Sequence, residues 1–169
     1  MHDWSGKLTI RLANESDVPA LRLLVNAAYR ELAEMGLNYT GSYQDEEITR
    51  TRMQGRDVYL AFLDGRLVAT ISTVIREQNG RTTLYISQFA VSPDLKRQGI
   101  GRFLMGYVER VARQRGIGRL GLDTATTAHH LVQFYSGLGF HVVAEDHWEG
   151  KTYRSYIMEK DLVEGGLAG

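Results

Sequence analysis

The residues best suited to chemistry lie in residues 94–104, where Gly99 and Gly101 stand among basic side chains. An apolar segment rich in β-formers, residues 84–91, precedes them, and apolar residues at helical spacing follow from Ile100. The glycines therefore mark the point where a strand turns into a helix. The first N–H groups of a helix lack intrahelical acceptors, and the helix dipole makes that end positive. Because glycine has no Cβ, an anion can approach the backbone closely, so the segment predicts a phosphate or pyrophosphate site.

Two common phosphate-binding motifs are excluded by the residues around these glycines. No Lys-Ser or Lys-Thr pair follows Gly101, as a Walker A loop requires, and Leu104 stands where a dinucleotide fingerprint has its third glycine. A formal G-x-G-x-x-G occurs at residues 116–121, but it follows a helix and opens a strand, the reverse of the required context. A tight turn with close helix packing is the alternative explanation for Gly99 and Gly101.

Two segments together resemble the GCN5-related N-acetyltransferases. Residues 91–101 resemble motif A of that family, Gln/Arg-x-x-Gly-x-Gly/Ala after a strand, with Lys96 at the Gln/Arg position. Residues 134–140 resemble motif B, which ends in Tyr-x-x-x-Gly-Phe, and the resemblance extends over residues 8–162. It implies an α/β (α+β) fold: a seven-stranded mixed, mostly antiparallel sheet with central parallel strands that splay apart, and about four helices.

The resemblance also implies that acetyl-CoA is the cofactor. The turn would bind its pyrophosphate, and the backbone of the preceding strand would pair with its pantetheine arm. The cofactor-binding residues expected on this basis are Phe89, Ala90, Val91, Lys96, Arg97, Gln98, Gly99, Ile100, Gly101, Arg102 and Tyr135.

The catalytic candidates are Tyr135, Gln88 and His130. Transfer of acetyl from sulfur leaves a thiolate. The resemblance implies that the Tyr135 phenol stabilises or protonates this thiolate, a general-acid role that raises the rate roughly 10²- to 10⁴-fold. A position in the helix core is the alternative for Tyr135. Many family members carry a Glu base where this chain has Gln88, which cannot titrate. His129 and His130 are candidates because imidazole is the common acid–base side chain of enzymes, although a polar helix start facing solvent explains both, and Asp123 is a further candidate base.

The acceptor is expected beside the first two helices and their connecting loop. Tyr29, Tyr39 and Tyr43 are the candidate acceptor-binding residues, and carboxylates lie near them in the sequence. Aromatic rings beside carboxylates suit an amine, through cation–π and ion-pair contacts. A solvated acidic helix start with ordinary loop tyrosines is the alternative.

Composition bounds the class of protein. The 169 residues carry 20 basic and 20 acidic side chains, so the formal net charge is zero, which argues against nucleic-acid and anionic-membrane partners. The absence of cysteine excludes disulfides, a thiolate nucleophile and cysteine metal sites, and no metal is expected. No apolar run approaches the roughly twenty residues of a membrane span, and the first residues lack the apolar core of a signal peptide. We therefore predict a cytoplasmic protein for which a homodimer is possible.

The elements that must position these residues follow from periodicity and turn signals. We expect a single domain, residues 1–169, with its core at about residues 8–162 and a loose tail at 163–169. Asp64-Gly65 and Asn79-Gly80 predict two hairpins, so three antiparallel strands lead into the glycine turn. The predicted strands are 8–12, 58–63, 66–75, 84–91, 119–124, 140–144 and 152–160; the predicted helices are 14–36, 45–54, the one that begins at Ile100, and 127–137.

The sequence thus predicts an enzyme that moves acetyl from acetyl-CoA to a primary amine, in a small molecule or a peptide, by direct attack in a ternary complex. A non-catalytic acyl-CoA-binding regulator is the alternative, because Gln88 and Ala128 replace the Glu and Asn that the family usually carries. A nucleotide-binding module that uses the same helix end is a third possibility.

Overall fold

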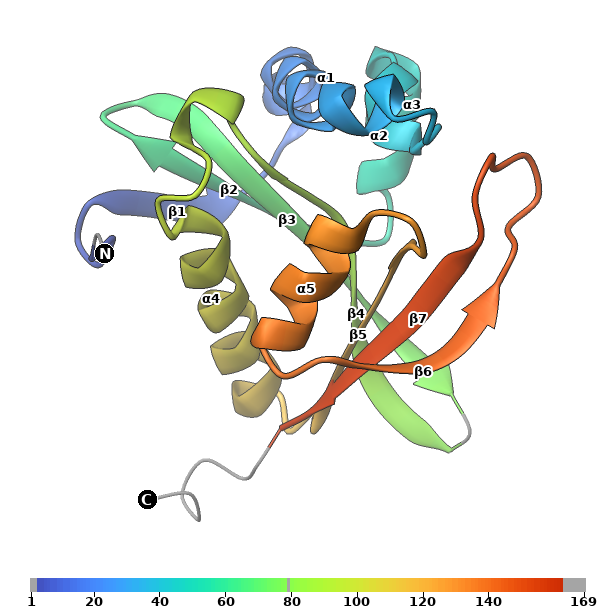
Figure 1. The fold of residues 1–169 in the computed structure, drawn as a ribbon. Helices are drawn as coiled ribbons and strands as arrows, with labels where there is room; N and C mark the ends of the chain where they lie inside the picture. The colour runs from blue at the N-terminus through green and yellow to red at the C-terminus, as the bar shows by residue number, and fades with distance from the viewer. Residues whose placement is uncertain (1–2, 79, 163–169) are drawn as a thin grey trace. The chain divides into compact units, whose positions relative to one another are not determined.

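A computed structural model describes residues 3–78 and 80–162 of the chain (Figure 1). The predicted tail at 163–169 and Asn79 of the second hairpin lie outside the described residues. Seven strands form one sheet in the order β1-β2-β3-β4-β5-β7-β6. By their internal contacts the residues form two compact units: unit 1 reaches to Thr73 and resumes over Gln88–Leu104, and unit 2 contains Val74–Ser87 and the chain from Met105 onward. Strands β3 (Arg66–Gln78) and β4 (Arg81–Val91) contribute residues to both.

Unit 1 contains the first two strands and the first three helices. β1 (Leu8–Leu12) pairs antiparallel with β2 (Asp57–Leu63), which pairs antiparallel with β3. The helices are α1 (Val18–Glu34), α2 (Thr40–Tyr43) and α3 (Glu46–Met53). The apolar face of α1 packs on the sheet, and the core of this packing consists of Leu21, Val25, Val58, Leu60 and Ala90.

A capping box fixes the start of α1. The Asn14 side chain accepts the Ser16 N–H at 2.9 Å, and the Asp17 carboxylate accepts the Asn14 N–H at 2.8 Å. The Arg11 guanidinium on β1 donates two hydrogen bonds of 2.8 Å to the same carboxylate. These bonds, with Arg11 the larger contributor, lower the pKa of Asp17 below its ordinary value. The pair therefore joins the first strand to the first helix.

Unit 2 contains β5 (Arg119–Ala125), β6 (His141–Asp146), β7 (Ser155–Asp161) and α5 (His129–Gly137). β7 pairs antiparallel with both β5 and β6 (Figure 1). The parallel register of β4 with β5 joins Leu84 to Leu120 and Tyr85 to Gly121, although β5 continues to Ala125. So short a parallel ladder agrees with the predicted splay of the central strands.

The lack of a side chain at Gly121 allows this parallel pairing. A Cβ at Gly121 would lie 3.0 Å from the Thr83 Cγ2 and 3.1 Å from the Tyr85 ring. Gly121 belongs to the G-x-G-x-x-G at residues 116–121, whose first glycine ends α4 (Ile100–Gln114) with a φ of 70°. That segment therefore ends a helix and opens a strand, and it is not a nucleotide fingerprint.

Five α-helices are present among the described residues, where the sequence predicted four. The helix not predicted is α2, a single turn in the segment predicted as a polar loop. Its Gly41 packs directly on α1, where a Cβ would meet Tyr29 and Val25 at 2.9 Å. Tertiary packing, and not local propensity, therefore fixes this turn. No helix in residues 3–78 or 80–162 has both the length and the apolar character needed to cross a bilayer.

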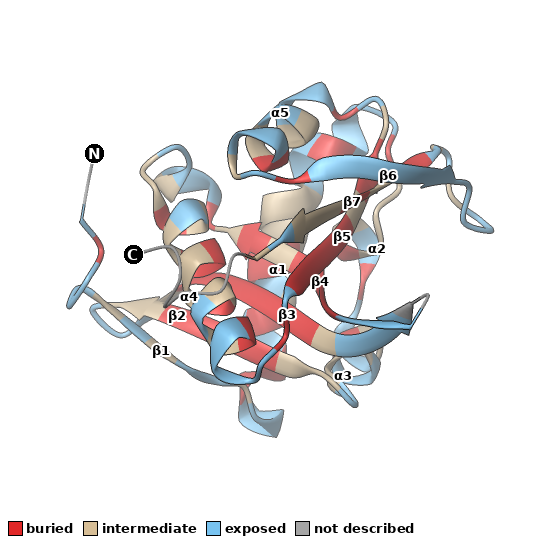
Figure 2. Ribbon diagram, turned by 90° about the horizontal axis from the view of Figure 1, so that it is seen from below, coloured by how far each residue is buried: buried red, intermediate tan, exposed pale blue. Residues whose placement is uncertain are grey.

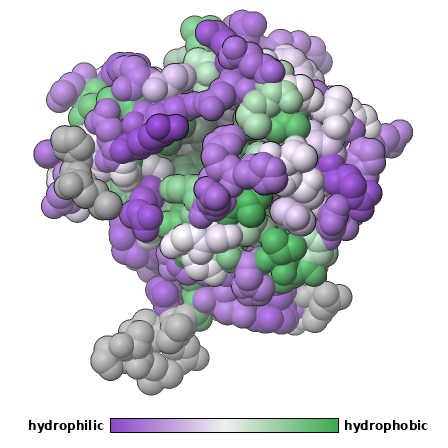
Figure 3. Space-filling model, in the orientation of Figure 1, coloured by the Kyte–Doolittle hydropathy of each residue, from purple (hydrophilic) through white to green (hydrophobic). Residues whose placement is uncertain are grey.

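Burial follows the strands (Figure 2). Buried residues run along β2 to β5, whereas all six residues of the edge strand β6 are exposed. The face drawn in Figure 3 is mostly hydrophilic, with apolar side chains in small patches. Polar residues therefore cover much of that face.

Candidate active site

The turn between β4 and α4 has the backbone geometry of an anion site. Arg97 and Gly99 have φ angles of 62° and 89°, so two residues of the turn are in the left-handed region. The Gly99 carbonyl accepts the Phe103 N–H at 2.9 Å, so α4 begins immediately after it. The next N–H groups, from Ile100 onward, have no acceptor within the helix. Alternating left-handed residues at a helix start turn successive N–H groups toward one point, which is how a backbone binds phosphate.

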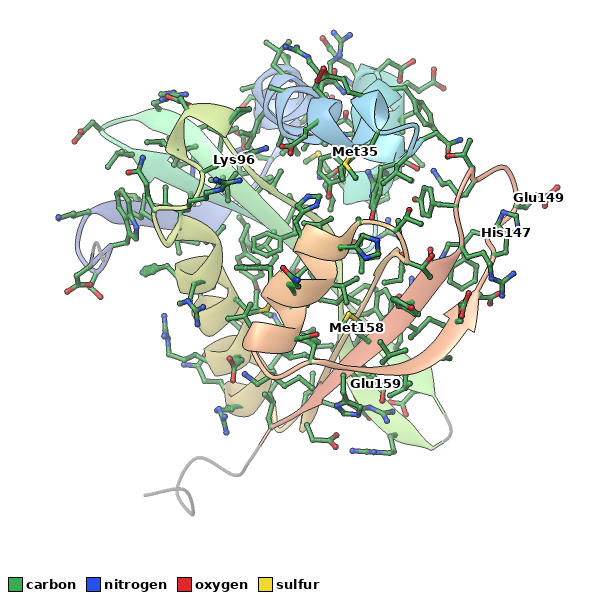
Figure 4. The ribbon with its side chains drawn as sticks, in the orientation of Figure 1. Met35, Lys96, His147, Glu149, Met158 and Glu159 are labelled. Carbon is green, nitrogen blue, oxygen red and sulfur yellow. The ribbon has the colours of Figure 1, made fainter. Side chains whose placement is uncertain are left out.

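The basic side chains of the turn differ in their pairing. Lys96 stands on the segment that leads into α4 (Figure 4), and its Nζ lies 2.8 Å from the Glu31 Oε2 of α1. Arg97 and Arg102 are exposed, and neither forms an ion pair with any residue that the structure describes. At this turn, an anion would therefore be attracted mainly by the charges of these two arginines, because the charge of Lys96 is offset by Glu31.

Long-range contacts hold the backbone of this turn. The Trp4 Nε1–H donates to the Gln98 carbonyl at 2.7 Å, and the Trp4 side chain is buried. Arg66 of β3 donates two bonds of 2.8 Å to Asp94 and one of 2.9 Å to the Ser92 Oγ. The Asp94 carboxylate also accepts the Ser92 hydroxyl, and the bonds from Arg66 and then Ser92 hold its pKa well below the ordinary value. The turn is therefore preorganised by the rest of unit 1.

The end of β4 offers its backbone on one side. The Ser92 N–H donates to the Val68 carbonyl of β3 at 2.8 Å. Because successive N–H groups of a strand alternate in direction, those of Phe89 and Val91 point away from β3. Tyr29 of α1 occupies the Phe89 groups: its hydroxyl donates to the Phe89 carbonyl at 3.0 Å and accepts the Phe89 N–H at 3.2 Å.

This contact changes the interpretation of two predicted site residues. Tyr29 was predicted to bind the acceptor and Phe89 to bind the cofactor through its backbone, and the structure joins the two by hydrogen bonds. The Tyr39 ring packs edge-on against Tyr29 with 5.6 Å between centroids, whereas Tyr43 lies exposed on α2. Unit 1 therefore brings Tyr29 and Tyr39 together with the end of β4.

Gln88 has an unusual conformation within β4. Its φ of 44° lies in the left-handed region, which a non-glycine residue adopts rarely and at a cost of about 1–3 kcal/mol. Its side chain is buried, with 6% of its surface exposed, and its Oε1 has no hydrogen-bond partner. An unsatisfied buried acceptor costs a further ~1–3 kcal/mol. Two such costs at one residue are typical of a functional site.

The other two catalytic candidates lie on α5 in unit 2. Tyr135 is buried, and its ring packs edge-on against Phe134 and Phe140 at centroid distances of 5.4 and 6.0 Å. His130 is exposed in the first turn of the helix. Five residues of α-helix correspond to about 140° of rotation, so His130 and Tyr135 face different directions on α5.

Asp123, the further candidate base, is engaged within unit 2. Its Oδ2 accepts the Tyr85 hydroxyl at 2.5 Å, and the Arg76 guanidinium stacks on the Tyr85 ring at 3.8 Å. Burial, followed by the nearby Asp123 charge, raises the pKa of Tyr85 far above its ordinary value. Across the described residues, no group of three His, Asp or Glu side chains is arranged to bind a metal ion.

Some residues that shape the site could not be found by sequence reasoning. Trp4, Glu31 and Arg66 contact the turn from 94, 65 and 28 residues away. No local pattern marks such contacts. Of the residues that hold the turn through side chains, only Ser92 and Asp94 belong to the motif at residues 91–101.

Comparison with known proteins identifies the family. The profile of the acetyltransferase (GNAT) family matches residues 20–140. This chain belongs to that family. Among curated relatives, the S-(2-succino)cysteine N-acetyltransferase of Bacillus subtilis (strain 168) is 26% identical over 157 residues, covering 90% of this chain and 94% of the relative. The S-alkylcysteine N-acetyltransferase of the same organism is 25% identical, covering 90% of this chain and 88% of the relative.

A solved structure supports the fold assignment. The GNAT acetyltransferase from Elizabethkingia anophelis, whose crystal structure contains acetyl-CoA, matches with a TM-score of 0.69 at 16% identity, over 92% of this chain and 99% of the other. The GNAT fold and the N-acetyltransferase class, both predicted from the sequence, are thus confirmed for this GNAT protein.

Proposed function

We propose that this GNAT protein moves an acetyl group from acetyl-CoA to a primary amine by direct attack in a ternary complex. The observation that carries the proposal is the turn before α4, with left-handed Arg97 and Gly99 and the N–H groups that follow. A pyrophosphate fits this backbone because it accepts several N–H bonds at once and favours the positive end of a helix. Arg97 and Arg102 would neutralise part of its charge.

The strand before the turn, β4, and the later helix α5 supply the remaining roles. The Val91 backbone points away from β3, which suits pairing with a pantetheine amide, while Tyr29 already bonds to the Phe89 backbone. Bound acetyl-CoA would supply a thioester, which is an activated acetyl group. The Tyr135 phenol would donate a hydrogen bond or a proton to the sulfur that leaves. His130, exposed on another face of α5, is the weaker catalytic candidate.

The acceptor class is proposed from the relatives. Both Bacillus subtilis relatives are named for cysteine derivatives that carry a substituent on sulfur, and this chain spans most of each of them. We infer a small amino-acid-type amine as the acceptor, in preference to a peptide. The single domain, the cytoplasmic location and the possible homodimer stay predictions.

The test combines turnover with cofactor binding. Purified protein is incubated with acetyl-CoA and a mixed amine library that includes S-substituted cysteines, and CoA release is measured. Release that depends on the amine, with an acetylated product in the mass spectrum, is the expected result. Binding of acetyl-CoA without turnover of any amine would favour the regulatory protein, and preference for ATP over CoA would favour the nucleotide-binding module.

A matched pair of variants tests the location of the cofactor. Gly101→Val places a branched side chain where the pyrophosphate is expected and should abolish measurable acetyl-CoA binding in calorimetry. Gly106→Val makes the same change five residues further along α4, where a Cβ would meet only Arg110, at 3.8 Å, and should bind normally. Equal affinity in the two variants would contradict the assignment of the turn.

A further inference from the structure

Two contacts between β3 and the β4 segment differ in register by one residue. Beside the turn of this hairpin, the Thr82 hydroxyl bonds to the Glu77 carboxylate, and at the other end the Ser92 N–H bonds to the Val68 carbonyl. From Glu77 to Val68 the chain runs nine residues, whereas from Thr82 to Ser92 it runs ten. This shift and the φ of 44° at Gln88 lead us to infer a β-bulge in β4 at Gln88, while the β2–β3 register shifts beside Val68.

The hydrogen bonds from α1 stabilise this bulge. The Tyr29 hydroxyl bonds to both backbone groups of Phe89, the residue immediately after Gln88. The Gln88 Oε1 is left buried without a donor, in a side chain that is 94% buried (6% exposed). Such an atom favours a ligand that brings an N–H or O–H group to it.

Two titratable groups of α1 contact β4 or the turn after it, and both are already engaged. On α1, the Tyr29 hydroxyl is bonded to Phe89 and Glu31 is paired with Lys96. On β2, Asp57 lies at the first position of the strand, opposite Thr73 of β3. The group at the bulge itself is an amide, which neither carries charge nor takes a proton between pH 5 and 10.

We propose that the Gln88 Oε1 accepts a hydrogen bond from the acceptor amine, and that the enzyme takes this amine in its uncharged form. The inference rests on the proposed acetyl transfer. A neutral amine attacks with its lone pair: the nitrogen–carbon bond forms, the carbon–sulfur bond breaks, and the electron pair leaves on sulfur. One proton then passes from the nitrogen to the sulfur, so the products are the acetamide and the CoA thiol. Gln88 orients one N–H and takes no proton.

This arrangement selects acceptors by the pKa of their amine. The α-amine at the end of a peptide, with a pKa near 7.8, is about 14% uncharged at pH 7, whereas a lysine-type amine of pKa near 10.4 is about 0.04% uncharged. The neutral form is thus roughly 300-fold more abundant for the α-amine. The carboxylate of a free amino acid raises the pKa of its α-amine, so a free amino acid has the same advantage to a smaller degree. A carboxylate in place of the Gln88 amide would instead attract the charged amine and deprotonate it. The substrate class that the bulge favours is therefore a compound with an α-amine.

The experiment measures kcat/KM for the best acceptor of the amine library from pH 6 to 9.5, with acetyl-CoA saturating. The expected profile rises about tenfold per pH unit up to the pKa of the acceptor itself, and it shifts with a second acceptor of different amine pKa. Gln88→Glu should flatten the rise by supplying a base. A profile that keeps the same midpoint with both acceptors would overturn the proposal, because an enzyme group would then set it.

Two further variants separate this role from a structural one. Gln88→Leu removes the acceptor atom and should raise the KM for the amine at least tenfold while leaving the KM for acetyl-CoA unchanged. Gln133→Leu, the same change at an exposed residue of α5, is the control. If Gln88→Leu melts early, Gln88→Glu keeps the side-chain shape and still gives the pH readout. An unchanged amine KM in Gln88→Leu overturns this inference alone, whereas no transfer to any amine by the wild-type chain overturns the proposed function as well.

Discussion

Replacement of Trp4 by phenylalanine tests whether the turn before α4, where we propose that pyrophosphate binds, is held in place by its contact with Trp4. The indole Nε1–H donates to the Gln98 carbonyl at 2.7 Å, one residue before Gly99. Phenylalanine keeps most of the buried ring but has no donor. The carbonyl then loses its partner from Trp4, and the backbone ahead of the left-handed Gly99 becomes less restricted.

The expected magnitude follows from this one bond. Trp4 is 7% exposed, so its hydrogen bond is largely protected from water. Losing a bond of this kind costs about 1–2 kcal/mol. For a chain of this size, that corresponds to a fall in melting temperature of roughly 2–8 °C. If the turn must be re-ordered when the cofactor binds, the same loss of about 1–2 kcal/mol should raise the KM for acetyl-CoA about fivefold to thirtyfold, with kcat nearly unchanged.

The assay is CoA release at varied acetyl-CoA, with thermal unfolding measured in parallel. The control is Trp148→Phe, which changes the second tryptophan, a partly exposed residue between β6 and β7 in unit 2. The control should leave both quantities unchanged, and it leaves Trp4 as the only tryptophan, so that its fluorescence reports on cofactor binding directly. A normal acetyl-CoA KM in Trp4→Phe would refute the idea that this bond organises the turn.

Three further predictions concern other parts of the chain. Tyr135→Phe should lower kcat about 10²-fold and leave acetyl-CoA affinity nearly intact, and normal kcat would remove the phenol from the mechanism. Gly41→Ala places a Cβ 2.9 Å from Tyr29 and should lower the free energy of unfolding by about 1–3 kcal/mol in denaturant titrations, whereas Gly137→Ala, with nothing within 4 Å of its Cβ, should not destabilise. Asp17→Asn should destabilise by about 1–2 kcal/mol at pH 7. Because the folded pKa of Asp17 is lowered, its contribution is present above about pH 4 and is lost as pH falls below, so wild-type and variant stabilities should converge in acid.

The regular elements of this chain could be predicted because local signals specify them. Asp64-Gly65 gave the hairpin between β2 and β3, and the helical spacing from Ile100 gave α4. The position of the turn between β4 and α4 was predictable for the same reason, since Gly99 and its neighbours form one short motif, while its role in binding pyrophosphate stays a prediction. Several element ends departed from the prediction by two or three residues: β3 ends later, β4 begins earlier, and α5 and β7 begin later than expected. One element, α2, was missed.

The contacts that shape the site could not be predicted from the sequence, because they join residues far apart in the chain. Tyr29 is an aromatic residue of the kind that binds substrates. Only the structure reveals that its hydroxyl bonds to the backbone of Phe89, 60 residues away in the chain. Gln88 was recognised as a departure from the expected Glu. Its left-handed φ and unpartnered oxygen depend on the pairing of two strands, which no spacing within one strand encodes.

The charge at the turn between β4 and α4 illustrates the difference between a sequence motif and a binding site. The sequence offers Lys96, Arg97 and Arg102 as three positive charges around the glycines, with Lys96 at the Gln/Arg position of the motif. In the structure, Glu31 lies 2.8 Å from the Lys96 amine and offsets that charge. An exposed pair of this kind contributes little to stability, so the lysine's pairing matters mainly for the local field. A pyrophosphate at this turn would therefore meet the end of a helix and two arginines that form no ion pair with any described residue, and the backbone geometry set by Arg97 and Gly99 must carry the larger share of its recognition.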